Sequence, residues 1–564
     1  MPNLTKSLMT EAQKQTWTLV GMQMPPVAVM EAMINAYFDR FHWFILLFHP
    51  PSFLRQARLI ISRSSWPRHE LGTVLTTLMV AALGLQCTAH DPAWQGRDKL
   101  ARACLDPLKL VADILSEVSR HLIQVLEDCE IETIQVYTLL AVYHISHGSP
   151  NLAFAYSGVA LRIGHGLSLQ SNRPSNATVV SEVAKRCWNH LMAAETFSSM
   201  IYGRSIPYAQ DFTSPHHILD MDDMMLESGL APGCSSLTWA TFHRLKNRIY
   251  TCLQDSLRSF SQLHRQAPIS PEYSERLAKV VRWAKLSLEE WRQTLPPFFD
   301  YHKWPNEDPE SQFKNGTTTL SREQQVLCLQ ATTLQIIYDS AVIFVNRPLL
   351  EHRIHAPESE GGENEETFTV LHESVSAALR ISRVPILKFE HEMALSFLLV
   401  HSFAAGVILC LPPTCYPFSQ MAQDAKSGVL NIVRASKSLM HRSAIAKSSQ
   451  EILTNLLKVT LDREIDIASD ISQTNERLYM MPLDMTSTLL ATQPRFRPDA
   501  EAESDIIHSE DVPPHFSTET QWYWPSAGDM PDYGFGIQPS RPMDPLSQAM
   551  FVGPDMAFRD MSAF

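Results

Sequence analysis

The stretch IETIQVYTLLAVYHISHGSPNLAFAYSGVALRIGHG, residues 131–166, decides the fold of this chain. Its first half spaces apolar residues three and four positions apart, which keeps them on one face of a helix with 3.6 residues per turn. The letters HGSP then break the pattern, and Ser149 and Pro150 predict the N-cap and first residue of a second helix. Gly164 and Gly166 predict a left-handed turn at the end of that helix. Its apolar stripe consists of Leu152, Tyr156, Val159 and Ile163.

A third amphipathic segment follows, opening near Ser181 and ending at Gly203 and Pro207. Its stripe is formed by Val183, Cys187, Leu191, Ala194, Phe197 and Ile201. Three such helices with short connections must bury their stripes on one another or on further helices. The sequence therefore predicts an all-α fold, a large multi-helix bundle.

Other helical windows and the composition support this fold class. Only 20 of the 564 residues are glycine, which is below the roughly 7% of an average protein. The long apolar run 393–411 contains Ser396, His401 and Ser402 and has neither a flanking basic cluster nor an aromatic belt, so it predicts a buried core helix rather than a membrane span. The remaining windows are 27–48, 71–85, 106–126, 239–264, 271–295, 322–350 and 367–459.

Prolines punctuate two of these windows. Pro50 and Pro51 are expected to stop the helix that begins near Val27, and to let Phe53 fold back into the core. Pro348 is expected to mark the end of the window that begins at 322, with Arg347 near the exposed carbonyls.

The cysteines and histidines offer no metal site. The nine cysteines are scattered, and no C-x2-C pair exists from which a zinc ribbon, a zinc finger or a six-cysteine binuclear cluster could be built. His144 and His147 share a helix face without a third ligand, so we interpret them as capping or surface residues. The cluster His216-His217, Asp220, Asp222 and Asp223 is the most metal-like, and we interpret it as a solvated loop.

No catalytic constellation is visible either. The chain lacks the P-loop, the dinucleotide-binding turn and the nucleophile elbow. The sequence therefore predicts no enzyme, and assigns no catalytic, cofactor-binding or metal-binding residue.

The charge pattern argues against a broad DNA-binding surface, since the formal net charge is −13. Arg244, Lys246 and Arg248 are too few to follow a phosphate backbone and are expected to flank the stripe of an amphipathic helix. Lys185-Arg186 and Arg204, if buried, need carboxylate partners, for which Glu195 is a candidate.

These observations divide the chain into an arm, a helical region and a tail. Residues 1–25 are expected to be a flexible arm and residues 26–485 a helical region, with mobile inserts at about 296–319 and 355–366. Residues 490–564 are expected to be a disordered acidic-aromatic tail. From Pro494 onward the tail has four arginines, no lysine and twelve Asp or Glu residues, so −8 of the net charge lies there. Acidic residues mixed with aromatic rings are typical of activation segments, and an inert disordered tail is the competing interpretation.

Several short motifs follow one another along the chain. The central motifs are Gly158-Val159-Ala160-Leu161-Arg162, Gly166-Leu167, Lys185-Arg186-Cys187-Trp188 and Gly203-Arg204-Ser205-Ile206, with Tyr37-Phe38, His49-Pro50-Pro51-Ser52-Phe53 and Asn346-Arg347-Pro348 as flanking ones. Their order resembles the middle homology region of fungal zinc-cluster transcription factors. The chain departs from the family pattern at Cys187, where a second tryptophan is usual, and at Ser205, where a proline is usual.

The resemblance implies a nuclear regulator of a fungal metabolic gene set, in some cases a secondary-metabolite cluster. In the family the zinc cluster reads DNA, whereas the helical region regulates activity or holds effectors. Because no cysteine cluster is present, we expect recruitment through a zinc-cluster DNA-binding partner, with the tail offered to transcriptional coactivators. Direct DNA contact and a truncated gene product remain open alternatives.

Two other classes of function remain open. The chain fits a helical enzyme or small-molecule sensor of a biosynthetic pathway, whose pocket would assemble from distant residues. A scaffold or inhibitor that pairs with an intact family member is the third class. A cavity with two or more close titratable side chains would favour catalysis, and a closed apolar interior would favour regulation.

Overall fold

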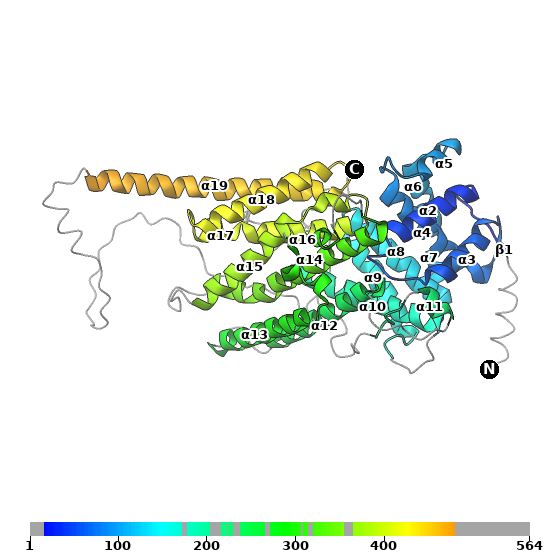
Figure 1. The fold of residues 1–564 in the computed structure, drawn as a ribbon, viewed down its shortest axis with the longest axis horizontal. Coiled ribbons are helices and arrows are strands. Elements are labelled where there is room, and N and C mark those ends of the chain that lie inside the picture. The colour runs from blue at the N-terminus through cyan, green and yellow to red at the C-terminus, as the bar shows by residue number, and fades with distance from the viewer. Residues whose placement is uncertain are drawn as a thin grey trace, which may run out of the picture. The chain divides into compact units, whose positions relative to one another are not determined.

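The computed structural model describes residues 16–171, 178–203, 216–221, 223–228, 237–265, 271–305, 308–313, 320–354 and 365–479 (Figure 1). Nearly all of them belong to helices, which confirms the predicted all-α fold. In the described part of the chain, strand pairing is limited to β1 (Thr16–Trp17) and β2 (Trp66–Pro67), where Trp17 lies opposite Trp66. The described residues through Glu464 form one body, and those from Ile465 onward belong to a second unit.

The described helical elements are 3₁₀ turns and α-helices. The 3₁₀ turns are η1 (Arg68–Glu70), η2 (Pro297–Phe299), η3 (Tyr301–Lys303), η5 (Pro309–Gln312) and η7 (Ile386–Phe389). The α-helices are α2 (Val27–Arg40), α3 (Pro50–Ile61), α4 (Leu71–Thr88), α5 (Gly96–Arg102), α6 (Pro107–Arg120), α7 (Leu122–Asp128), α8 (Ile131–Ser146), α9 (Pro150–Gly166), α10 (Val179–Tyr202), α11 (Asp223–Ser228), α12 (Trp239–Arg265), α13 (Pro271–Gln293), α14 (Arg322–Ile354), α15 (Glu365–Arg383), α16 (Ala394–Leu409), α17 (Leu411–Cys415), α18 (Gln420–Leu439) and α19 (Ala444–Tyr479).

Helix α8 is the centre of the packing. It contacts α4, α7, α9, α10 and α16, and the N-terminal helix α2 reaches it through α4. Helices α12, α13 and α14 pack on one another, and α14 continues the contacts to α15 and α16, against which α18 packs (Figure 1). The stripes predicted at residues 131–202 are thus buried on further helices, as the sequence requires.

Local sequence chemistry explains several helix ends. Thr178 accepts a hydrogen bond from the Ser181 amide at 3.2 Å, and the Ser181 hydroxyl accepts one from the Thr178 amide, which starts α10 with a capping box. Gly203 ends α10 in the left-handed conformation, with φ of 64°, a region that glycine adopts without steric cost.

The end of α9 differs from its prediction. Gly164 and Gly166 belong to the helix, and the left-handed residue after it is Ser168, with φ of 57°. Gly164 has a packing role instead, because a Cβ there would lie 3.2 Å from Leu191 Cδ1 and 3.4 Å from Trp188. Ser149 occupies the predicted N-cap, although its side chain makes no capping hydrogen bond.

The segment after α2 also differs from the expectation. The helix ends at Arg40, and Pro50 and Pro51 begin α3 instead of only stopping the preceding helix. His49 Nδ1 accepts the Ser52 amide at 3.3 Å and caps α3, where proline sacrifices no hydrogen bond. Phe53 lies in the core, as predicted, with its ring centroid 4.6 Å from that of Phe48.

Two further segments differ from the sequence-based description in the described residues. The expected mobile insert at 296–319 contains η2, η3 and η5, and buries Phe299 and Trp304. The Trp304 indole donates to the Phe298 carbonyl at 2.8 Å, which holds the turn. Pro348 lies inside α14, which continues to Ile354, so it does not mark the helix boundary.

The expected flexible arm, 1–25, is attached from residue 16 onward. The amides of Val20 and Gly21 donate to the two carboxylate oxygens of Glu117 at 2.8 and 2.7 Å. Trp17 packs on Trp66, with centroids 5.4 Å apart. Residues 1–15 lie outside the described residues, as do the 355–364 part of the second expected insert and the expected tail at 490–564.

Glu392 joins the N-terminal helices to the later ones. Its carboxylate accepts the Trp43 indole N–H at 2.7 Å and the Arg40 guanidinium at 3.0 Å. Arg322 at the start of α14 adds an ion pair at 2.9 Å. The Glu392 side chain is nearly inaccessible to water, so these charge-assisted contacts replace its lost hydration.

Three described segments are long and apolar enough to cross a bilayer by length and composition: Arg68–Thr88, Arg322–His352 and Ala394–Cys415. Between 67% and 83% of the residues in their most apolar windows are buried inside the protein. Packing against other helices therefore accounts for their composition.

We predict that Gly84→Ala disrupts the contact between α2 and α4. A Cβ at Gly84 would lie 2.0 Å from the Met33 carbonyl oxygen, so the two backbones must separate. We expect a loss of about 3 kcal/mol or more in the free energy of unfolding, measured with urea. Gly158→Ala in α9 is the matched control, because its Cβ meets no atom within 4 Å. The control should gain about 0.5–1 kcal/mol, and equal stabilities of the two variants would contradict the packing.

Candidate functional site

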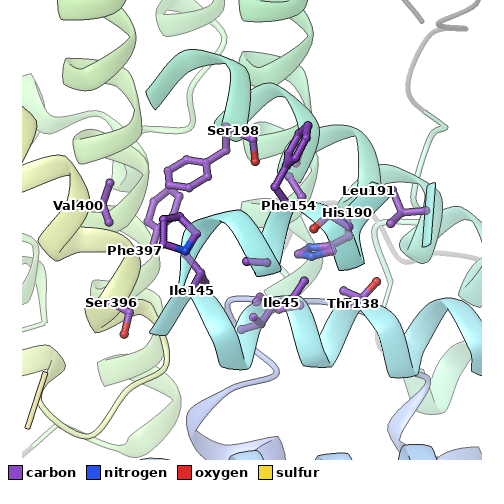
Figure 2. Close-up of a pocket in the computed structure, with 18 of the residues that line it drawn as sticks. Ile45, Thr138, Ile145, Phe154, His190, Leu191, Ser198, Ser396, Phe397 and Val400 are labelled. Atoms are coloured by element: carbon purple, nitrogen blue, oxygen red, sulfur yellow. The ribbon is translucent and has the colours of Figure 1, made fainter. Parts of the chain in front are cut away.

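A cavity of about 110 Å³ lies where α8, α9, α10, α12 and α16 meet (Figure 2). Its residues come from six separate stretches of sequence, including the turn after α2. In the view of Figure 2, His190 and Thr138 lie toward one side of the lining, with Ser396, Phe397 and Val400 toward the other. The full lining is Phe44, Ile45, Thr138, Ala141, Val142, Ile145, Pro150, Ala153, Phe154, Ser157, His190, Leu191, Ala193, Ala194, Phe197, Ser198, Tyr202, Lys246, Tyr250, Met393, Ser396, Phe397 and Val400.

The lining is mainly apolar with a few polar groups, which is the usual composition of a small-molecule site. The lining residues include one ammonium, one imidazole and several hydroxyls, but no carboxylate. The hydroxyl of Thr138, a residue only 3% exposed, has no hydrogen-bond partner in the described part of the chain. A buried hydroxyl without a partner costs free energy, and a bound molecule could supply the missing bond.

Lys246 is the charged group of the cavity. Its Nζ donates to the Phe44 carbonyl at 2.7 Å and lies 5.1 Å and 5.2 Å from the ring centroids of Phe44 and Phe242. Among the described residues no carboxylate pairs with it, and the residue is 7% exposed. Burial lowers the pKa of this amine from 10.5 to about 7. The cavity wall therefore holds an amine that titrates near neutral pH, without a counter-ion from the described residues.

His190 and Tyr250 are two further titratable groups that line the cavity with Lys246. Burial, with a smaller contribution from the Lys246 charge, lowers the pKa of His190 to about 3, so the imidazole is neutral at pH 7. Burial raises the pKa of Tyr250, so its phenol keeps its proton. A neutral imidazole has one N–H donor and one acceptor nitrogen, and no described residue engages either in His190.

We predict that the stability difference between the native chain and Lys246→Met depends on pH. Between the folded pKa of about 7 and the unfolded value near 10.4, the unfolded chain binds the extra proton. The native chain therefore gains stability relative to the variant as pH rises, on the order of 3 kcal/mol between pH 7 and 9.5.

The measurement is urea unfolding of both proteins at the two pH values, in reducing buffer. The variant removes the ammonium, and every other titrating group is common to both proteins. His190 and the neighbouring His243, whose pKa burial lowers well below 6.5, are neutral across this window and add no slope. A constant difference would show that Lys246 titrates as it does in water.

Arg186 is buried at a second polar cluster and serves the fold. Its guanidinium donates to Asp223 Oδ1 at 2.5 Å and to the Phe48 carbonyl at 2.6 Å, and lies 3.7 Å from Glu182. His49 Nε2 lies 2.9 Å from the Asp223 carbonyl. From the sequence, Glu195 was the candidate partner, whereas the structure pairs Arg186 with Asp223 and Glu182. Arg204 lies outside the described residues.

The expected solvated loop at 216–223 is wrong for His216 and Asp223, whereas His217 in the same loop is exposed. His216 is 5% and Asp223 is 6% exposed. The Asn189 amide fixes the segment, because it donates to the His216 carbonyl at 2.8 Å and accepts the His216 amide at 3.0 Å. Asp220 contacts Arg244 and Thr238 instead of a metal ion, and Asp222 lies outside the described residues.

The other histidines singled out from the sequence pack against aromatic rings. His144 stacks on Tyr156, with centroids 5.4 Å apart, and His147 stacks on Tyr143 at 4.0 Å. Across the described ranges, no group of three or more His, Cys, Asp or Glu residues is placed to hold a metal ion.

Sequence reasoning missed Lys246, which was expected to flank the stripe of its helix. The missed signal was its spacing. Lys246 follows Phe242 by four residues and precedes Ile249 and Tyr250 by three and four, which places it within the buried stripe. Arg244 and Arg248 do lie off that stripe, where they contact Asp220 and Thr294. His190 follows Cys187 by three residues, on the edge of the α10 stripe.

Comparison with known proteins finds similarity to fungal transcriptional regulators. Residues 34–294 match the model of the fungal specific transcription factor domain. An uncharacterized transcriptional regulatory protein of Schizosaccharomyces pombe is 20% identical over 334 residues, which cover 59% of this chain and 37% of that protein.

Two thiamine repressible genes regulatory proteins of the same organism also match. The protein thi1 is 22% identical over 445 residues, covering 77% of this chain and 51% of thi1. The protein thi5 is 26% identical over 195 residues, covering 33% of this chain and 22% of thi5. The chain thus spans about half or less of the length of these relatives. No solved structure matches.

Residues 34–294 of this chain are a fungal specific transcription factor domain, and its relatives are transcriptional regulators. The domain contains four of the five helices that enclose the cavity, together with the turn after α2. Helix α16, which supplies the remaining wall, lies beyond the matched region.

Proposed function

We propose that this chain is a nuclear transcription regulator of a fungal metabolic gene set, and that its helical domain holds a small-molecule effector. The match of residues 34–294 to the transcription factor domain carries the proposal. The cavity supports the effector, since it is small, mainly apolar and contains the Thr138 hydroxyl, which has no partner among the described residues.

Recruitment to promoters through a DNA-binding partner is part of the proposal. The printed sequence has no cysteine pattern for a zinc cluster and a net charge of −13, which disfavours a broad surface for phosphate. A zinc-cluster protein as the partner would supply base recognition. The acidic-aromatic composition of residues 490–564 supports binding to coactivators, with the rings docking in an apolar groove.

The relatives' names connect thi1 and thi5 with thiamine repressible genes, which supports metabolic genes as the targets here. The cavity itself does not suit thiamine. Thiamine carries a permanent positive charge, whereas the lining offers an ammonium and no carboxylate. We therefore propose a metabolic effector of different charge.

A helical enzyme or small-molecule-binding protein of a biosynthetic pathway is the second candidate. The observation in its favour is that Lys246, His190 and Tyr250 line one cavity, and a buried amine with a pKa of about 7 suits proton transfer. Against it, the lining contains no carboxylate to exchange a proton with the Lys246 amine, which donates to the Phe44 carbonyl and faces two aromatic rings.

We predict that the tagged full chain occupies promoters of the genes whose transcripts change when its gene is deleted. Chromatin capture and transcript profiling in the native host measure the two sets. Removing the DNA-binding partner should abolish the occupancy without changing the amount of the chain. Occupancy that persists without any partner would indicate direct DNA contact, and transcript changes without occupancy would favour the enzyme.

We also predict that residues 490–564, tethered to an unrelated DNA-binding domain, activate a reporter gene. Exposed rings are required to dock on a coactivator, so changing Trp522, Tyr523 and Trp524 to alanine should remove most of the reporter output. The matched control keeps the rings and changes three serines of the same segment to alanine, namely Ser540, Ser547 and Ser562. No output from the native segment would contradict an activation role.

A further inference from the structure

The charge of the cavity lining restricts what it can bind. Lys246 is the one cationic group among the lining residues, and neither the lining nor any other described residue supplies a carboxylate partner for it. A buried ammonium without a counter-ion is costly, as its lowered pKa shows. A group that brings a negative charge into the cavity would remove this cost.

The hydrogen-bond donors of the cavity lining also favour an acceptor group in the bound molecule. The Phe44 carbonyl uses one of the three Lys246 Nζ hydrogens, which leaves two. The neutral imidazole of His190 has an N–H to give, and the Thr138 hydroxyl has no partner in the described ranges. A carboxylate accepts up to four hydrogen bonds and donates none, so it complements this set.

The rest of the lining sets the size and polarity of the molecule. The cavity of about 110 Å³ is comparable to an apolar cavity of roughly 150 Å³ that binds benzene. Aromatic and aliphatic side chains, including Phe154, Phe197 and Phe397, form its walls. The room is therefore that of about one six-membered ring or a branched aliphatic chain.

We propose that the cavity binds a small monocarboxylate with a compact apolar body. The carboxylate contacts the Lys246 ammonium and accepts hydrogen bonds from His190 and Thr138, while the apolar body packs among the phenylalanines. The binding of the acid is inferred from the size, charge and hydrogen-bond donors of the cavity, and only its role as an effector rests on the proposed function.

Benzoate is the probe for this site, with benzamide as its neutral counterpart and benzylammonium as a cation of similar size. Calorimetric titration of the purified full chain should show benzoate binding at least tenfold tighter than benzamide, and benzylammonium not at all. Equal affinity for benzoate and benzamide, or no binding of benzoate, would overturn the proposal.

Variants locate the binding. Lys246→Met should reduce benzoate affinity at least tenfold and leave benzamide unchanged, because the methionine keeps the length of the side chain and removes its charge. Ala153→Leu fills the cavity from α9 and should abolish both. Its matched control is Ala155→Leu, two residues along the same helix on the exposed side. Benzoate binding that survives Lys246→Met or Ala153→Leu would place the site elsewhere.

The binding test can still be carried out if a variant does not fold. Each variant is checked by its helical circular dichroism, and Ala194→Leu, which fills the cavity from α10, replaces Ala153→Leu if that variant does not fold. These titrations measure binding without reference to transcription. A regulator that occupies promoters but does not bind benzoate would refute this inference alone, and benzoate binding without promoter occupancy would refute only the regulatory role.

Discussion

The structure depends on the burial of the central part of helix α8. Ten consecutive residues, Thr133–Val142, are shielded from water on every face, so neighbours must surround the helix. Helices α4, α7, α9, α10 and α16 do so, although they come from distant parts of the chain.

The polar residues of α8 then need partners inside the protein. Thr133 donates to the Val125 carbonyl at 2.8 Å and Gln135 to the Leu47 carbonyl at 3.2 Å. Thr138, where the neighbours leave space, has none among the described residues. The cavity is thus a space that the helices packed around α8 leave unfilled.

Arg186 and Lys246 are both buried cations, but the partners that surround their charges differ. Both donate to a carbonyl of the turn after α2, Arg186 to Phe48 and Lys246 to Phe44. Arg186 also has two carboxylates, which offset the loss of hydration and fix α11 to α10 and to this turn. Within the described ranges, Lys246 has only the carbonyl and two aromatic rings, which are weaker compensation for a full charge. The first cation is satisfied by the fold itself, and the second is satisfied only in part, at the wall of a cavity.

The sequence predicted the fold much better than the site. Apolar spacing is a local property, and it located helices such as α4, α12 and α13 close to their observed bounds. Prolines were harder to interpret, because the same residue stops a helix, starts one or lies within it according to which carbonyls are nearby. Pro50 begins α3 and Pro348 lies within α14. The turns at 297–312 were missed because Phe299 and Trp304 are buried by tertiary contacts that leave no periodic pattern.

The cavity could not be predicted, since its walls come from stretches brought together only by the packing of α8. The position of Lys246 in its helical stripe was readable, but the lack of a counter-ion among the described residues was not.

The wall of the cavity is continuous with the contact that joins the earlier and later helices. The turn after α2 presents the Phe44 carbonyl and ring to Lys246, and its neighbour Trp43 donates to Glu392. Glu392 in turn binds Arg322 at the start of α14 and precedes α16, which forms another wall of the cavity. A change in the charge or position of Lys246 therefore acts on a turn whose other side chains hold the helices beyond residue 294 in place. Such continuity becomes regulation only if this turn has a second stable packing, because a ligand shifts an equilibrium only through a difference in its affinity for two states.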